Sequence, residues 1–290
     1  NVLALMFAEP ARSLFQRTIL QSAANYGLSM PTLDDERQRG IDLGRVVGAE
    51  TLERLREVPA DELLEMYTDS FSDHYHSPAI DGQLITESTW EDIQARDFAG
   101  HQLMVGTNNA EWLGSVSDDT TVDDVLLAAR NNPRIGGDKA IPLIVGEDDP
   151  RRAMDRLITA DAYLCPSQNV AANRTASGGS AWMYFFSRVR EDEAAKAFDA
   201  FHGAEYSYVF GVHDDYMTTT ATDHKLAATM QKYWINFAAT GNPNGAGIPE
   251  WPMFKHPDPL VQELGDEIRT VPALEPEMCA AFEEWNDQQK

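Results

Sequence analysis

The sequence predicts an α/β fold in which helices cover both faces of a mostly parallel sheet, and two observations support this. Short apolar runs at residues 18–21, 102–107 and 181–187 are typical of buried strands. Long helical patterns separate these runs, as expected where successive strands of a parallel sheet are joined by helices. With 43% apolar residues, the 290-residue chain can also bury a sizeable core.

The first apolar run is followed by a long helical segment. Residues 34–47 and 49–58 carry amphipathic helical patterns. Pro59 comes next, with acidic residues directly behind it, and this order is typical of a helix start. We therefore expect a helical excursion between the first and second strands of the sheet.

The rest of the chain alternates between strand and helix patterns. Gly106 is expected to close the second strand, and the loop 108–112 follows it. The remaining expected elements are a helix capped by Thr121, helices at 150–156 and 161–174, a strand at 181–187, a helix at 226–240, two short strands near 260–263 and 267–271, and a last helix at 276–286. No internal repeat, low-complexity tract or long linker interrupts this order.

The charge balance excludes several classes of partner. With 23 Lys+Arg against 47 Asp+Glu, the formal net charge is −24, so the chain offers no basic footprint for nucleic acid or for an anionic membrane surface. The longest apolar stretch, residues 2–8, is too short to span a bilayer. Because residue 1 is Asn and not Met, we expect a cut end with any signal peptide upstream of it.

Candidate catalytic groups lie in loops after two predicted strands, which is where an α/β sheet places its ligands. Glu111 follows the second strand, and His202 lies downstream of the third. Acid first and histidine later is the chain order of an α/β-hydrolase triad. From the residues alone, a solvated surface acid and a structural or exposed histidine remain the alternatives.

Other chemistry finds little support in the sequence. There is no G-x-S-x-G motif, and Ser22 lies in an apolar-flanked segment without a glycine elbow. His74 and His76 lack the spacing of a zinc signature and are expected in an extended segment before Pro78. Neither a Gly-rich phosphate loop nor HExxH occurs, so no cofactor and no metal are expected.

Several ordered segments make the chain resemble the C-terminal part of a type B carboxylesterase, the cholinesterase-like branch of the α/β-hydrolases. They run from the first residues to the last helix: NVLALM at 1–6, SLFQRTILQS at 13–22, PAIDG at 78–82, VGTNNAEW at 105–112, HGAEYSYVFG at 202–211, YWINFAATGNPNG at 233–245 and PEWP at 249–252. The resemblance implies an α/β-hydrolase fold. It also implies that residues 1–290 are one part of a single carboxylesterase domain whose nucleophile and oxyanion hole lie upstream.

The resemblance also assigns roles to individual residues. Glu111 is the implied triad acid and His202 the implied general base, with the serine a few residues before Asn1. Trp112 stands where the family usually has glycine, and we expect it to reshape this loop and narrow the acyl pocket.

The two cysteines, Cys165 and Cys279, align with positions that are disulfide-bonded in cholinesterase-like members. The resemblance therefore implies that they pair, and two buried free thiols are the alternative. A disulfide would favour an extracellular or periplasmic location.

The leading hypothesis is a hydrolase of small-molecule carboxylic esters, working through a Ser-Glu-His triad of which this chain supplies the acid and the base. By itself the chain is expected to be inactive or nearly so. The alternatives are a catalytically inactive cholinesterase-like adhesion or scaffold protein, and a segment that complements a separate serine-bearing chain. If His202 is not the base, His213 is the next candidate. The sequence does not indicate the acyl or alcohol preference or an oligomeric state.

Overall fold

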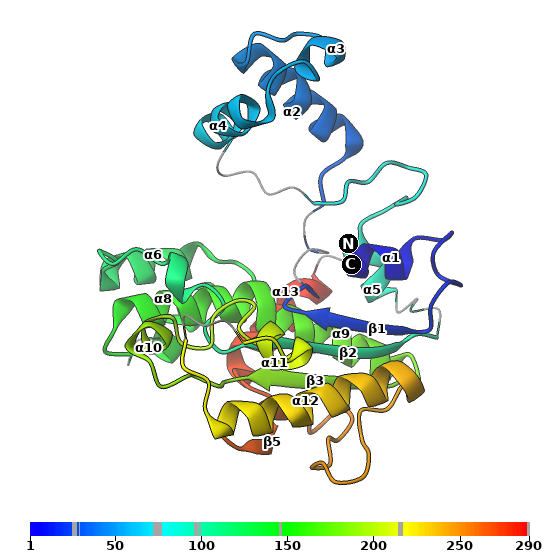
Figure 1. The fold of residues 1–290 in the computed structure, drawn as a ribbon, viewed down its shortest axis with the longest axis vertical. Coiled ribbons are helices and arrows are strands. Elements are labelled where there is room, and N and C mark those ends of the chain that lie inside the picture. The colour runs from blue at the N-terminus through cyan, green and yellow to red at the C-terminus, as the bar shows by residue number, and fades with distance from the viewer. Residues whose placement is uncertain are drawn as a thin grey trace.

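The computed structural model describes residues 1–288 except 25–27, 29, 72–76, 96, 97, 99, 145, 146 and 214–216 (Figure 1). His74 and His76 therefore lie outside the described residues. The strands are β1 (Arg17–Gln21), β2 (Gln102–Asn108), β3 (Ala181–Phe186), β4 (Leu260–Leu264) and β5 (Ile268–Pro272). The helices are α1 (Val2–Phe7), α2 (Leu33–Val46), α3 (Leu52–Leu55), α4 (Ala60–Phe71), α5 (Thr89–Gln94), α6 (Val122–Asn131), α7 (Ile141–Ile144), α8 (Pro150–Thr159), α9 (Cys165–Ala176), α10 (Glu193–Phe198), α11 (Tyr206–Phe210), α12 (Ala221–Thr240) and α13 (Pro276–Asp287).

The five strands form one sheet in the order β1-β2-β3-β4-β5. The first four strands run parallel, and β5 returns antiparallel to β4. In register, Met104 of β2 lies between Ile19 of β1 and Trp182 of β3. The predicted mostly parallel α/β sheet is confirmed, and the carboxyl ends of β1, β2 and β3 meet at one edge.

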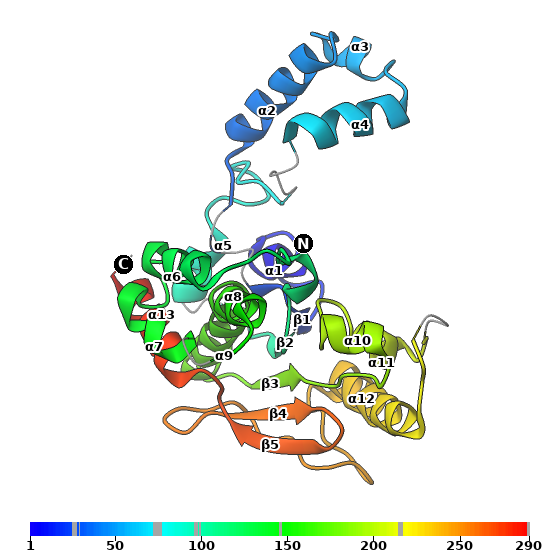
Figure 2. The same cartoon turned by 90° about the vertical axis from the view of Figure 1, so that its left-hand side faces the viewer.

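Both faces of the sheet are covered by helices, as Figure 2 shows around β3. Alternate residues of β3 enter two separate cores, because successive side chains of a strand point to opposite faces. Met183 and Phe185 belong to the core that includes residues of α8, α9 and α13, whereas Tyr184 and Phe186 belong to the core built on α12. This burial on both faces explains why β3 reads as a continuous apolar run.

The expectation that Gly106 closes the second strand is wrong. Gly106 lies inside β2, which continues to Asn108. A Cβ atom at this position would lie 2.3 Å from the ring of Tyr184 on the neighbouring strand. The glycine is therefore required by a close packing contact and not by a turn.

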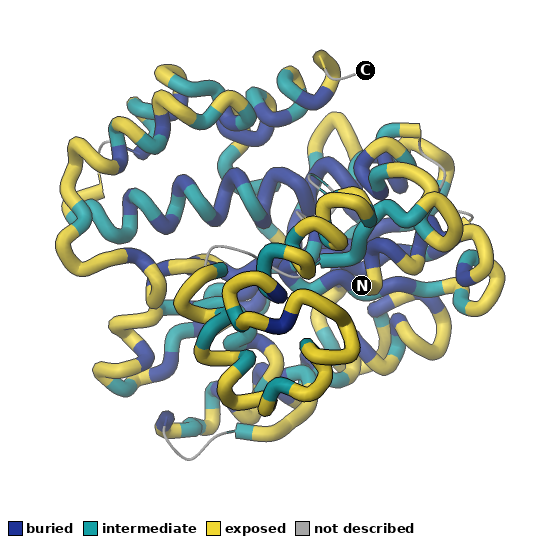
Figure 3. The backbone as a smooth tube through the Cα atoms, turned by 90° about the horizontal axis from the view of Figure 1, so that it is seen from above, coloured by how far each residue is buried: buried dark blue, intermediate teal, exposed yellow. Residues whose placement is uncertain are grey.

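Helices α2 to α4 form an arm that projects from the body of the molecule (Figure 1). Seen from above, this arm is mostly exposed or half-buried (Figure 3), and α3 and α4 contain no buried residue. The helix expected over 49–58 is only one turn, Leu52–Leu55. Proline disfavours helical geometry in the residue before it, so Pro59 accounts for the break ahead of α4.

The π-helical segment η4 (Ala160–Leu164) joins α8 to α9. The two helices predicted at 150–156 and 161–174 therefore belong to one uninterrupted helical segment. Within the described residues, no helix combines the length and apolar composition needed to cross a bilayer.

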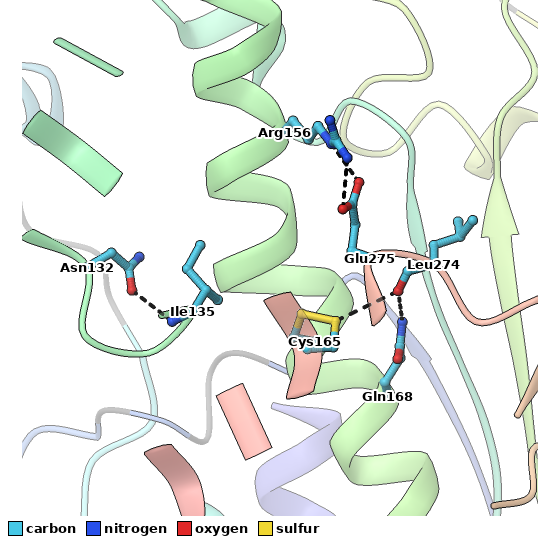
Figure 4. Close-up of a disulfide and its surroundings, with 8 residues drawn as sticks. Asn132, Ile135, Arg156, Cys165, Gln168, Leu274 and Glu275 are labelled. Atoms are coloured by element: carbon cyan, nitrogen blue, oxygen red, sulfur yellow. Dashed lines mark hydrogen bonds and ion pairs between the residues drawn. A yellow bond between two sulfur atoms is a disulfide. The ribbon is translucent and has the colours of Figure 1, made fainter. Parts of the chain in front are cut away.

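A disulfide between Cys165 and Cys279 fastens the start of α9 to α13 (Figure 4). The Cα atoms of the two cysteines are 4.8 Å apart, and both residues are buried. Beside the bond, Leu274 O accepts a hydrogen bond from Gln168, and Arg156 pairs with Glu275. The predicted pairing is confirmed.

Removal of this bond is expected to lower the free energy of unfolding by roughly 2–5 kcal/mol, because the bond closes a loop with a sequence separation of 114 residues. Denaturant unfolding of a Cys165→Ala/Cys279→Ala variant measures this loss. Reductant should destabilise the parent protein by a similar amount and leave the double variant unchanged. Equal stability of the two proteins under oxidising conditions would contradict the prediction.

Candidate active site

Two loops at the carboxyl edge of the sheet come together at the candidate site. Ala110, just after β2, forms a parallel bridge with Phe201, and its N–H donates to Ala200 O at 3.1 Å. The side chain of Asn108 ties the same loops by donating to Phe201 O at 2.7 Å. These bonds place Glu111 and His202, which follow the bridged residues, beside each other.

Glu111 and His202 form a direct hydrogen bond, with 2.6 Å between Glu111 Oε2 and His202 Nδ1. The Glu111 side chain is fully buried, whereas 37% of the His202 side chain is exposed. Among the described residues, no hydrogen bond engages His202 Nε2. The pair thus has a buried acid, a fixed imidazole and a second ring nitrogen that is open to a further partner.

The other oxygen of the Glu111 carboxylate is held by three donors. Oε1 accepts from Ser22 Oγ and Thr107 Oγ1, each at 2.5 Å, and from the backbone N–H of Asn108 at 2.7 Å. A buried charge is costly unless it is paired and hydrogen-bonded, and these donors supply that compensation. They also leave Oε2 directed at the histidine.

The pKa of His202 is raised above its ordinary value. The hydrogen bond from the ring to Glu111 is the largest cause, burial opposes it, and the charges of Glu111 and Glu205 add to it. The negative charges of Glu111 and Glu205 therefore favour the imidazolium, which is the form a general base reaches after taking a proton.

Glu205 is a second buried acid, and it lies three residues after His202 in the loop that we call the histidine loop (residues 199–205). It is 1% exposed and accepts hydrogen bonds from Gln21 at 2.9 Å and Asn108 at 2.6 Å. Burial raises the pKa of Glu205, and the charge of Glu111 adds to this. Glu205 thus joins the carboxyl ends of β1 and β2 to the start of α11.

Two aromatic rings flank the imidazole of His202. The ring of Tyr163, from η4, lies 5.5 Å from it, and that of Trp112 lies 6.2 Å away. Trp112 is 42% exposed and stacks on Tyr163. Its φ of −126° is open to any L residue, so this position does not itself require the glycine usual in the family.

Sequence reasoning identified the acid and the histidine but missed most of their partners. Ser22 lacks the glycine elbow of a nucleophile, and the sequence assigns it no other role; the structure shows it bound to Glu111, with a φ of 50° that is unusual for a residue other than glycine. Its position directly after β1 was the one signal available. His213, the alternative base, accepts a hydrogen bond from Arg190 at its Nδ1 and is not bonded to Glu111. In the described part of the chain, no cluster of three or more His, Cys, Asp or Glu side chains suits a metal ion.

Comparison with known proteins agrees with this architecture. The profile of the Carboxylesterase family matches residues 1–282. Liver carboxylesterase of Sus scrofa is 26% identical over 99% of this chain and 57% of its own length, and carboxylesterase 1C of Rattus norvegicus is 24% identical over 98% and 56%. The chain therefore spans a little over half the length of these relatives.

Solved structures show the same fold. A PNB esterase superposes with a TM-score of 0.78 at 23% identity, covering 97% of this chain and 60% of that protein. A thermophilic PNB esterase gives a TM-score of 0.77 at 23% identity. These likenesses show an α/β-hydrolase fold. Since the family profile covers nearly the whole chain, the protein belongs to the carboxylesterase family.

Proposed function

We propose that the protein hydrolyses small-molecule carboxylic esters through an acyl-enzyme, with Glu111 as the acid and His202 as the general base. The observation that carries this proposal is the 2.6 Å hydrogen bond between the buried Glu111 carboxylate and His202 Nδ1, with Nε2 left open. This is the arrangement that general-base activation of a serine needs.

In the proposed reaction, His202 Nε2 takes the proton of a serine hydroxyl as its oxygen attacks the ester carbonyl. Glu111 fixes the tautomer with the proton on Nδ1 and stabilises the imidazolium. The tetrahedral intermediate collapses when His202 returns the proton to the leaving alkoxide, which departs as the alcohol. Water then attacks the acyl-serine by the same route, releasing the carboxylic acid and restoring the serine.

The serine and the oxyanion donors are proposed to lie outside these 290 residues, upstream of Asn1. The absence of G-x-S-x-G from the sequence and the partial coverage of the relatives support this. Residues 1–290 would then be the C-terminal part of a single carboxylesterase domain. The disulfide supports an extracytoplasmic location.

The most direct test is to sequence the encoding nucleic acid upstream of Asn1, express the complete polypeptide, and assay it with a chromogenic aryl ester. A G-x-S-x-G within about ten codons, and esterase activity that a serine-directed organophosphate abolishes, are the expected results. A replaced serine, or no turnover of any ester in a broad panel, would overturn the proposal in favour of an inactive adhesion or scaffold protein.

Glu111→Gln is expected to lower kcat of the complete enzyme by about 10²–10⁴-fold, since an amide does not stabilise the imidazolium and permits the wrong tautomer. Neutral His202 is the active form, so the rate of the parent enzyme should rise with pH through the raised pKa of this ring. Loss of the Glu111 charge should move that inflection to lower pH. A pH–rate profile measures both effects, with Glu250→Gln, at an exposed position, as the control. An unchanged profile would contradict the assignment of the acid.

A further inference from the structure

Helix α8 contacts the backbone of the loop that carries Glu111 (residues 108–112, the acid loop) through two side chains on one face. Asp155 and Thr159 are one turn apart and are 4% exposed each. Asp155 Oδ1 accepts the backbone N–H of Trp112 at 2.7 Å. Thr159 Oγ1 accepts the N–H of Glu111 at 3.2 Å and donates to Asp155 Oδ1 at 3.4 Å.

We infer that Asp155 and Thr159 are positioning residues for the proposed acid–base pair, and that they act by holding the backbone of Glu111 and Trp112. The inference rests on the proposed function for its catalytic consequence. The three donors on Glu111 Oε1 fix the carboxylate, whereas these two bonds fix the main chain that carries it. Each bond joins residues more than 40 positions apart, so neither is a by-product of local turn geometry.

The same helix holds the histidine loop. Arg152, one turn before Asp155, binds Asp199 at 2.6 Å. Asp199 lies three residues before His202 and has a φ of 57°, which is strained for a residue other than glycine. Its carboxylate also accepts from Asn109 at 3.1 Å and from Ala200 N–H at 2.7 Å. One rigid element thus sets the positions of both loops, as a preorganised site requires.

The position of Asp155 makes the hydrogen bond that it accepts from the Trp112 N–H sensitive to pH. The charged groups around it are Arg152 and Arg156 on its own helix, Glu111 in the acid loop, and Asp199, Glu147 and Glu275 on the neighbouring segments. The two arginines are already paired with Asp199 and Glu275, and no ion pair joins a cation to Asp155 in the described part of the chain. Burial raises the pKa of Asp155 to about 6, its hydrogen bonds to Trp112 and Thr159 oppose this, and the charges of Glu111 and Asp199 add to it.

A cavity of about 430 Å³ borders Asp155 and Thr159 and gives them access to solvent. Protons can therefore reach the carboxylate without unfolding of the helix. Below about pH 6 the protonated carboxyl is a weaker acceptor for the Trp112 N–H. The hydrogen bond between Asp155 and the acid loop is thus strongest above that pH.

The test compares Asp155→Ala, which removes the acceptor, with Asp155→Asn, which keeps an acceptor oxygen and removes the charge. In the complete polypeptide, hydrogen–deuterium exchange of the peptide that contains residues 109–114 is expected to be at least tenfold faster in Asp155→Ala. Asp155→Asn has a neutral acceptor, like the protonated acid, so at pH 8 its exchange should lie between those of the parent and of Asp155→Ala, without the inflection near pH 6 that is expected of the parent. Unchanged exchange in Asp155→Ala would overturn the inference.

Esterase kinetics give the second readout. Asp155→Ala is expected to lower kcat by about 10–100-fold with a change in KM below about threefold, because a small displacement of the acid costs rate and not binding. Asp155→Asn should restore part of kcat, because its neutral oxygen still accepts the Trp112 N–H. Glu147→Gln removes a charge from the same cavity without touching the loop and should leave kcat unchanged. Equal losses of kcat in Asp155→Asn and Asp155→Ala would overturn a role through the hydrogen bond.

Thr159→Val and Thr159→Ser provide a second pair in case Asp155→Ala does not fold. The valine variant lacks the acceptor for the Glu111 N–H, and serine keeps it, so only valine should accelerate exchange of the loop. Because exchange is measured without substrate, it distinguishes the two proposals. Faster exchange in a protein that hydrolyses no ester would support the positioning contacts and reject the function, whereas unchanged exchange in an active esterase would do the reverse.

Discussion

Replacement of His202 by Ala is expected to lower kcat of the complete enzyme by roughly 10⁴-fold or more, with the fold intact. The loss is large because a serine without its base is a poor nucleophile at neutral pH. The fold should survive because 37% of the His202 side chain is exposed and Glu111 Oε1 keeps its three donors. Steady-state kinetics with an aryl ester, together with circular dichroism of the same samples, measure both effects.

His224→Ala is the matched control, since His224 is an exposed histidine on α12 and has no contact with Glu111. It should retain full activity. If His202→Ala also remains active, the base lies elsewhere and His213 is the next residue to replace. If the parent protein itself turns over no ester, the acid–histidine pair is not catalytic. That result would support the alternative hypothesis of an inactive adhesion or scaffold protein.

The order of elements could be predicted from sequence because their signals are local. The apolar run of β3 and the Gly241 that ends α12 are read within a few residues of each element. The prediction that Gly106 ends a strand is wrong because the glycine is required by a contact with the ring of Tyr184 on a different strand. A close approach between strands leaves no trace in the local pattern around the glycine.

The candidate site was predictable only in part, and for the same physical reason. Glu111 and His202 lie in motifs that resemble those of a known family, so they could be identified without knowledge of their geometry. The groups that hold Glu111 come from three separate segments: Ser22 follows β1, Thr107 lies in β2, and Thr159 belongs to α8. These residue types are common on protein surfaces, and only the assembled sheet edge shows that they converge.

The buried ion pair at the start of α12 is expected to give a large stability effect. Arg188, just after β3, has a side chain that is 3% exposed, and that of Asp223 on α12 is fully buried. Arg188 binds both oxygens of Asp223, at 2.8 and 3.2 Å. Tyr208 donates to the same carboxylate at 2.6 Å, and Thr220 N–H at 2.8 Å. The pair therefore joins the carboxyl end of β3 to α11 and α12.

Asp223→Asn is expected to lower the free energy of unfolding by about 3–5 kcal/mol, because it leaves a buried guanidinium without its buried counter-charge. Asparagine keeps the size and one acceptor oxygen of aspartate, so the loss reports the charge. Asp266→Asn is the matched control: Asp266 binds the same guanidinium at 2.7 Å but is 75% exposed, and its loss should cost about 1 kcal/mol or less. Urea unfolding of the two variants should separate them clearly, and equal losses would contradict the prediction.

The pH dependence of stability gives an independent check on this pair. Burial alone would raise the pKa of Asp223, but the hydrogen bonds from Arg188, Tyr208 and Thr220 outweigh it and hold the pKa well below the ordinary value. Since the pKa is lower in the folded than in the unfolded state, the stabilisation is complete above the unfolded value of about 4 and is lost as the pH falls below it. The difference in unfolding free energy between the parent and Asp223→Asn should therefore shrink in acid. A difference that stays constant down to about pH 3 would mean that the carboxylate charge of Asp223 is not its source.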